Sequence, residues 1–250
     1  MDKILVDEMS WSQFREAMAA NDLIIMPIGS TEAHGPHNPL GTDTFIASDV
    51  AEAVGRRVKA PVAPPMPVGN ALGLIGFPGT ANIGAELLHR VLLQVCESFA
   101  NHGAKRFLFI NGHGGNASTL RAVSANLFAD LGVLSVSTEW WTTLPHLMDI
   151  EIHEHGGLYE TSFALKVAED SVDLAKVPEE SVDEDSLGQL GLGRFEGVPL
   201  KRPYPMGRVH PLGYFGSDVM NASKETGEDL FDKYVEFCVG LAEELRRITL

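Results

Sequence analysis

Carboxylate and imidazole side chains lie close together in the segment 32–37, EAHGPH, and Asp43 follows shortly after it. The segment comes directly after an apolar run over 23–28 that is typical of a buried strand. Residues i and i+2 of an extended segment point to the same side, so Glu32 and His34 can face one ligand together. Such oxygen and nitrogen donors bind divalent metals, and a nearby aspartate can bridge them. The pattern therefore predicts a metal site.

A second segment, 111–116, has the sequence NGHGGN and follows another apolar run over 106–110. Ligands of open α/β sheets bind beyond the carboxyl ends of the strands, so we expect His113 to lie near the first segment. Gly114 and Gly115 permit close approach of the backbone, and we expect a metal-bound substrate to lie against them. A phosphate-binding turn is the alternative, but neither a Rossmann nor a Walker pattern accompanies this histidine.

A third segment, 153–162, has the sequence HEHGGLYETS and adds further imidazoles and carboxylates. The apolar spacing from Tyr159 onward predicts a helix with Glu160 in its first turn, where the helix dipole favours a carboxylate for structural reasons alone. The functional interpretation makes Glu160 a metal ligand or a carboxylate base, and His155 a proton donor to the leaving group. Spacing alone does not decide between these interpretations.

Strand-like apolar runs alternate with longer helical patterns, which predicts a largely parallel sheet covered on both faces. The expected strands are 23–28, 61–68, 106–110 and 133–138. A first helix is expected after a capping box at Ser10 and Gln13, and a second is expected to begin at Asp43 or Thr44. Three further helices are expected over 86–100, 119–131 and 223–245. Two segments rich in glycine and proline, 69–84 and 186–216, are typical of active-site covers or subunit contacts.

The overall composition limits the classes of function. With 250 residues and 44% hydrophobic content, we expect one domain over residues 1–250. A net charge of -15 argues against binding to nucleic acid or to an anionic membrane surface. The amino-terminal residues lack the basic and apolar parts of a signal peptide, and no apolar stretch is long enough to span a bilayer, so we expect a cytoplasmic protein. Cys96 and Cys238 lie in apolar helical patterns and are expected to be buried thiols.

The three segments, in this order and together with Asp43, resemble the creatininase (creatinine amidohydrolase) family. This resemblance implies a three-layer α/β/α sandwich with a mostly parallel sheet, assembled as a homohexamer, and two divalent metals bridged by an aspartate and a water. It implies Glu32, Asp43 and His113 as ligands of one metal. It implies His34 and Asp43 as ligands of the other, with Asp43 as the bridge.

The chain departs from creatininase itself at Gly115, where creatininase has a glutamate ligand. Glu160 is our expected substitute at the second metal, and the resemblance also suggests His155 as the acid/base. Tryptophan side chains close the substrate pocket of creatininase, so Trp140 and Trp141 are candidates by position. Ordinary packing of an aromatic pair after a strand is the alternative.

The predicted activity is hydrolysis of a C-N amide bond in a small cyclic or formyl amide, by a hydroxide that bridges two divalent ions. Zinc, manganese or iron fits the mixed donor set. Because Gly115 departs from creatininase, creatinine itself is not our preferred substrate. A ring-opening hydrolase of an inosose-type cyclic ketone is the alternative enzyme. A catalytically inactive, metal-dependent small-molecule binding protein is the alternative from another class.

Overall fold

Three parallel strands form the central sheet, in the order β1-β2-β3. The computed structural model describes residues 3–178, 194–196, 198–199, 210–216 and 218–249. The strands are β1 (Leu23–Ile28), β2 (Arg106–Asn111) and β3 (Leu134–Glu139). The helices are α1 (Trp11–Ala20), α2 (Thr42–Val58), α3 (Gly84–Ala100), α4 (Ala117–Leu131), α5 (Trp140–Thr143), α6 (Leu158–Ala168) and α9 (Lys224–Arg247). A separate antiparallel pair joins β4 (Arg194–Phe195) to β5 (Val198–Pro199).

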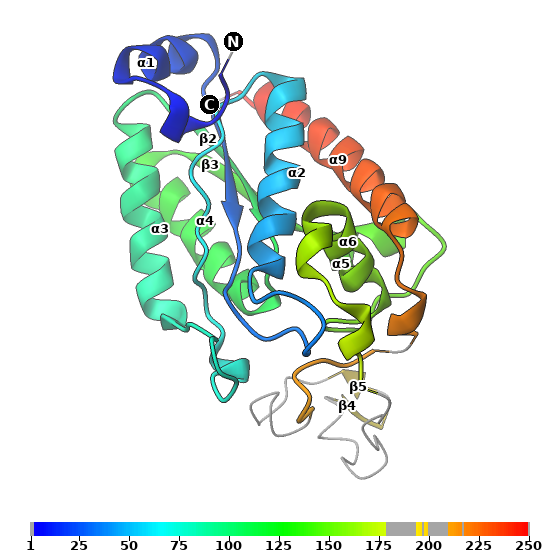
Figure 1. The fold of residues 1–250 in the computed structure, drawn as a ribbon. Helices are drawn as coiled ribbons and strands as arrows, with labels where there is room; N and C mark the ends of the chain where they lie inside the picture. Colours follow the sequence, from blue (N-terminus) through cyan, green and yellow to red (C-terminus); the bar gives the residue numbers. More distant parts are fainter. Residues whose placement is uncertain (1–2, 179–193, 197, 200–209, 217, 250) are drawn as a thin grey trace.

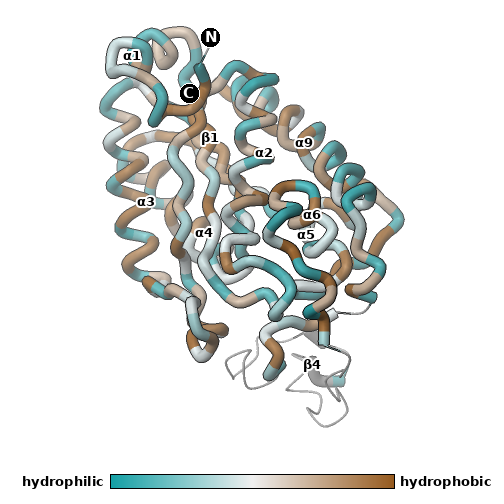
Figure 2. Tube along the Cα trace, viewed as in Figure 1, coloured by the Kyte–Doolittle hydropathy of each residue, from teal (hydrophilic) through white to brown (hydrophobic). Residues whose placement is uncertain are grey.

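Helices cover both faces of the sheet, with α2, α6 and α9 on one side and α3 and α4 on the other (Figure 1). Successive side chains of a strand point to opposite faces, so each strand supplies both layers. Ile25 and Leu108 pack with α2 and α9, whereas Ile24 and Phe107 pack with α3 and α4. Figure 2 shows the apolar β1 enclosed between helices that also carry hydrophilic segments. The predicted three-layer α/β/α class is confirmed.

The segment 61–68 does not form the fourth strand that its apolar content predicts. It makes isolated parallel bridges only: Val62 pairs with Ile25 of β1 and with Leu5, and Met66 pairs with Ile28 of β1. Proline has no N–H group and cannot donate to a strand ladder. Four residues of this segment, at positions 61, 64, 65 and 67, are prolines. A continuous ladder is therefore impossible here, and this prediction is wrong.

The helix boundaries follow local capping chemistry. Ser10 and Gln13 form the predicted capping box of α1, and the Ser223 side chain accepts from a backbone N–H in the first turn of α9. The helix expected at Asp43 or Thr44 begins at Thr42 instead, so Asp43 lies in its first turn. The two cysteines are buried free thiols, as predicted. No helix in the described part of the chain has the length and apolar character that crossing a bilayer requires.

Candidate metal centre

Five ionisable side chains from four segments meet at the carboxyl end of the sheet. Glu32 and His34 lie in the loop after β1, Asp43 in the first turn of α2, His113 directly after β2, and Glu160 in the first turn of α6. All five are buried or nearly so. The parallel sheet explains their convergence, because parallel strands end at one edge and their following loops share it.

One ligand group combines Glu32, Asp43 and His113, whose donor atoms lie within 4.8 Å of one another. His113 Nδ1 is 3.1 Å from Glu32 Oε1 and 3.3 Å from Asp43 Oδ2. The other oxygen of Glu32 accepts a hydrogen bond of 2.9 Å from the Ser30 hydroxyl. This hydrogen bond leaves Oε1 directed toward the group, and fixes the carboxylate in that orientation.

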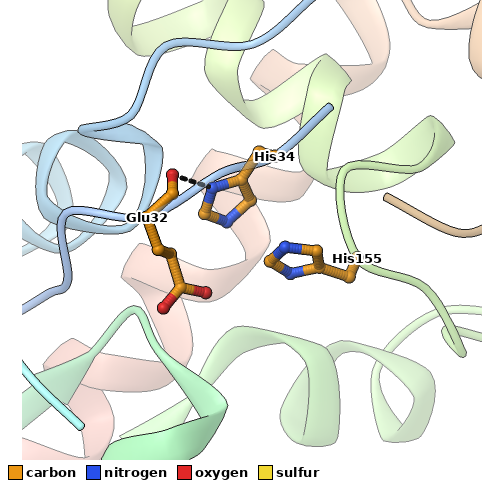
Figure 3. A group of neighbouring side chains, drawn as sticks. All are labelled: Glu32, His34 and His155. Atoms are coloured by element: carbon orange, nitrogen blue, oxygen red, sulfur yellow. Dashed lines mark hydrogen bonds between the residues drawn. The ribbon is translucent and has the colours of Figure 1, made fainter. Parts of the chain in front are cut away.

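A second ligand group combines His34, Asp43 and Glu160. His34 Nε2 lies 2.9 Å from Asp43 Oδ1 and 3.6 Å from Glu160 Oε1. Asp43 thus presents Oδ2 to the first group and Oδ1 to the second, which is the arrangement of a bridging carboxylate. Glu32, His34 and His155 form a third possible group, in which the rings of the two histidines are 4.2 Å apart (Figure 3).

The imidazoles of His34, His113 and His155 each have one ring nitrogen within hydrogen-bond distance of a backbone carbonyl. A carbonyl oxygen only accepts, so that nitrogen carries the proton and, in the neutral ring, the other has a free lone pair directed at the cluster. The contacts are His34 Nδ1 to Glu32 O at 3.1 Å, His113 Nε2 to Asn70 O at 3.0 Å, and His155 Nε2 to Ala33 O at 2.7 Å. Protein metal sites orient histidine ligands in this way.

The unpaired atoms of the cluster fit a pair of divalent cations. His34 Nε2 and Asp43 Oδ2 are buried and make no hydrogen bond. A buried polar atom without a partner is costly, and a cation between imidazole and carboxylate donors would satisfy both atoms. Mixed nitrogen and oxygen donors suit zinc, manganese and iron.

The ionisation of the cluster shows how strongly it attracts positive charge. Burial by itself lowers the pKa of an imidazole, but the charges of Glu32 and Asp43 outweigh it and raise the pKa of His113 to about 10. Asp43 and Glu160 likewise hold the pKa of His34 well above its usual range despite its burial. Burial would raise the pKa of Asp43, but the charge of His34 lowers it. In the metal-free protein, protons therefore occupy positions that suit cations.

A cavity of about 280 Å³ opens beside the cluster. All four residues predicted to contact the substrate line this cavity: Gly114, Gly115, Trp140 and Trp141. Trp140 is 2% exposed and also packs against Phe163, with 5.5 Å between ring centroids, so packing and pocket lining coexist in this residue. The loop 69–84, predicted as a site cover or a subunit contact, supplies one wall through Asn70, Ala71, Gly73 and Leu74.

Residues that sequence reasoning missed complete the surroundings. Glu154 lines the cavity, accepts a 2.8 Å hydrogen bond from the backbone N–H of Glu160, and has a pKa raised to about 7 by burial. Phe215 also lines the cavity, and its segment pairs with His155 through two backbone hydrogen bonds of 2.8 Å. Glu154 lies within the third segment, and Phe215 lies within the 186–216 segment that was predicted as an active-site cover or a subunit contact, but no pattern singled out either residue. Most other positions of the 186–216 segment lie outside the described residues.

An α/β/α sandwich with histidines and carboxylates gathered at the carboxyl end of its sheet belongs to the class of proteins whose active sites form at that edge. The sequence profile of one family, described as creatinine amidohydrolase, matches residues 7–242. The chain therefore belongs to the creatininase family, which places it among hydrolases.

Three characterised relatives have different activities. A mycofactocin precursor peptide peptidase of Mycolicibacterium smegmatis is 33% identical over 94% of this chain and 89% of its own length. A 3-dehydro-scyllo-inosose hydrolase of Thermotoga maritima is 34% identical over 78% of this chain and 65% of its own length. A creatinine amidohydrolase of Pseudomonas putida is 28% identical over 97% of this chain and 96% of its own length. Membership of the family therefore does not fix the substrate.

The fold likeness extends over the whole chain. A crystal structure of creatinine amidohydrolase (creatininase) superposes with a TM-score of 0.81, covering 99% of this chain and 100% of that one. The two sequences are 23% identical, so this comparison establishes the fold.

Proposed function

We propose that this protein is a dinuclear metal-dependent hydrolase that cleaves a C-N amide bond in a small cyclic or formyl amide. The observation that carries the proposal is the placement of Asp43, which presents one carboxylate oxygen to each of two ligand groups. Related creatininase structures, 24% identical to this chain, are described as a Zn-Zn type and a Mn form. Zinc, manganese or iron would suit the donors present here.

Glu32, Asp43 and His113 would hold one cation, and His34, Asp43 and Glu160 the other. The grouping of Glu160 with His34 and Asp43 supports the expectation that Glu160 replaces the glutamate ligand that creatininase has at the position of Gly115. When bound, a pair of cations lowers the pKa of a water and polarises a carbonyl oxygen.

The remaining chemistry belongs to the side chains. Burial, together with the charge of His34, lowers the pKa of His155, so this imidazole is neutral at neutral pH. Its Nε2 proton is held by the Ala33 carbonyl, which leaves Nδ1 to take a proton from the attacking water and return it to the departing nitrogen. Trp141 and the backbone of Gly114 would orient the substrate across the cavity.

The size of the cavity favours a small substrate. Pockets for small molecules have volumes of roughly 300 to 1,000 Å³, and this cavity of about 280 Å³ lies at the lower limit. An inosose-type cyclic ketone remains the second candidate, because the inosose hydrolase relative is 34% identical over 207 residues. We further propose that the whole chain forms one domain, that six copies assemble as a homohexamer, and that the protein acts in the cytoplasm.

Protein purified without chelator should contain two divalent cations per chain, measured by elemental analysis. A panel of creatinine, other cyclic amides, formyl amides, inososes and short peptides should yield product from a cyclic or formyl amide. Stripping the metal should abolish turnover, and adding back zinc, manganese or iron should restore it. A bound small molecule without any product would instead support the binding-protein alternative, and full turnover in excess chelator would refute the proposal.

Metal affinity should rise with pH. The pKa of His113 is about 10 in the metal-free protein, so its imidazole carries a proton at neutral pH that a cation must displace. Each displaced proton makes the apparent affinity rise by about tenfold per pH unit, up to the pKa. Calorimetric titration with zinc at pH 7, in two buffers of different ionisation enthalpy, should show proton release. Binding without proton release would contradict this prediction.

A further inference from the structure

The orientation of His113 depends on a residue outside the three segments that carry the histidines and carboxylates. Its Nε2 donates to the backbone carbonyl of Asn70, 3.0 Å away, which directs Nδ1 at Glu32 and Asp43. Asn70 belongs to the loop 69–84, which contributes no side-chain ligand to the cluster. The position of this one carbonyl therefore decides where the lone pair of His113 points.

Asn116 holds that carbonyl in place. Its Oδ1 accepts a 3.0 Å hydrogen bond from the backbone N–H of Asn70, and its Nδ2 donates 2.9 Å to the carbonyl of Gly29. The Asn116 side chain is fully buried. In addition, the Asn70 side chain donates 3.1 Å to the carbonyl of Gly115. One amide thus joins the loop after β1, the loop 69–84 and the loop after β2.

Two glycines leave the space that this network needs. A Cβ on Gly69 would lie 2.5 Å from Asn116 Oδ1, and a Cβ on Gly115 would lie 2.2 Å from the Asn70 carbonyl oxygen and 2.4 Å from His113 Nε2. Such distances are shorter than van der Waals contact. A side chain at Gly115 would therefore intrude on the hydrogen bond between His113 and Asn70, which gives this glycine a specific purpose.

We propose that Asn116 is a positioning residue for the metal site of Glu32, Asp43 and His113, acting through the Asn70 carbonyl. The inference rests on the proposed function, because it concerns the affinity of one of the two proposed cation sites. The other site does not depend on Asn116 in this way. There, His34 takes its carbonyl partner from Glu32, within its own loop.

The test is calorimetric titration of the chelator-stripped protein with Zn²⁺. For Asn116→Ala, the affinity of one site should fall by about 10- to 100-fold, the usual effect of removing an outer partner of a metal ligand, while the other changes little. Asn126→Ala is the matched control. Asn126 lies in α4, the helix that Asn116 precedes as its N-cap residue, and its side chain bonds to His89 away from the cluster, so both affinities should be unchanged.

Gly69→Ala gives a second variant should Asn116→Ala fail to fold. It keeps the amide but crowds its oxygen, and should weaken the same site. Nitrogen NMR of the zinc-loaded wild-type protein supplies a readout that needs no variant: His113 should be protonated at Nε2 and bound to zinc through Nδ1.

The outcomes separate the inference from the proposed function. Wild-type protein that binds no zinc would overturn both. Suppose that the wild-type protein binds zinc at two sites. If Asn116→Ala and Gly69→Ala then leave both affinities unchanged, or weaken both sites equally, the role of Asn116 is overturned while the dinuclear centre stands. A His113 ring protonated at Nδ1 in the loaded protein would also overturn it.

Discussion

Replacing Asp43 with asparagine should reduce the bound cations from two to at most one and lower turnover by at least about 10³-fold. The loss should exceed the 10- to 100-fold effect of an outer partner, because Asp43 itself serves both ligand groups. Its two oxygens lie 2.9 Å from His34 Nε2 and 3.3 Å from His113 Nδ1. An asparagine offers one weak oxygen donor and no charge, so it cannot hold two cations together. Elemental analysis and turnover of the same preparation provide the measurement.

Asp49→Asn supplies the control for this experiment. Asp49 lies on the same helix, α2, and is partly buried, with burial raising its pKa, but it belongs to neither ligand group. The control should keep both cations and full turnover. Thermal denaturation in chelator reports whether either variant has lost its fold. Two bound cations and unchanged turnover in Asp43→Asn would refute the dinuclear mechanism.

The sequence was most informative where strands meet loops. Strand runs are recognisable from apolar composition, and the observed β1, β2 and β3 differ from the predicted ranges by one residue at most. The residues that follow a parallel strand have only one edge of the sheet to occupy. Proximity of Glu32, His34 and His113 could therefore be expected before any coordinates. The same reasoning failed for 61–68, because apolar content does not compensate for the missing N–H groups of its four prolines.

Contacts made by the backbone were beyond sequence reasoning. The Asn70 carbonyl orients His113, but every residue has a carbonyl, so no side-chain pattern marks this one. Phe215 lines the cavity from a segment far along the chain, and only the folded structure brings it there. The sequence could suggest that Gly115 permits close approach of the backbone. Only the coordinates show that a side chain there would collide with the hydrogen bond between His113 and Asn70. Sequence thus predicted donor types, whereas their orientation came from the fold.

Replacing His155 with glutamine should lower kcat by about 10² to 10⁴-fold while both cations remain bound. Glutamine can keep a donor near the Ala33 carbonyl, where His155 Nε2 lies 2.7 Å away, but it has no titratable atom in place of Nδ1. The variant should therefore lose the acid limb of its pH–rate profile, because no group is left to take the proton from the attacking water. Steady-state kinetics across pH, with metal content measured alongside, tests this.

His153→Gln is the matched control, since His153 precedes His155 by two residues, is exposed, and does not line the cavity. It should retain both kcat and the acid limb. The metal content decides between two roles for His155, because this residue also lies in a possible ligand group with Glu32 and His34. Loss of a cation from His155→Gln would make the imidazole a ligand. Retention of both cations with a collapsed kcat would make it the proton carrier, because only then does the defect lie in the chemical step.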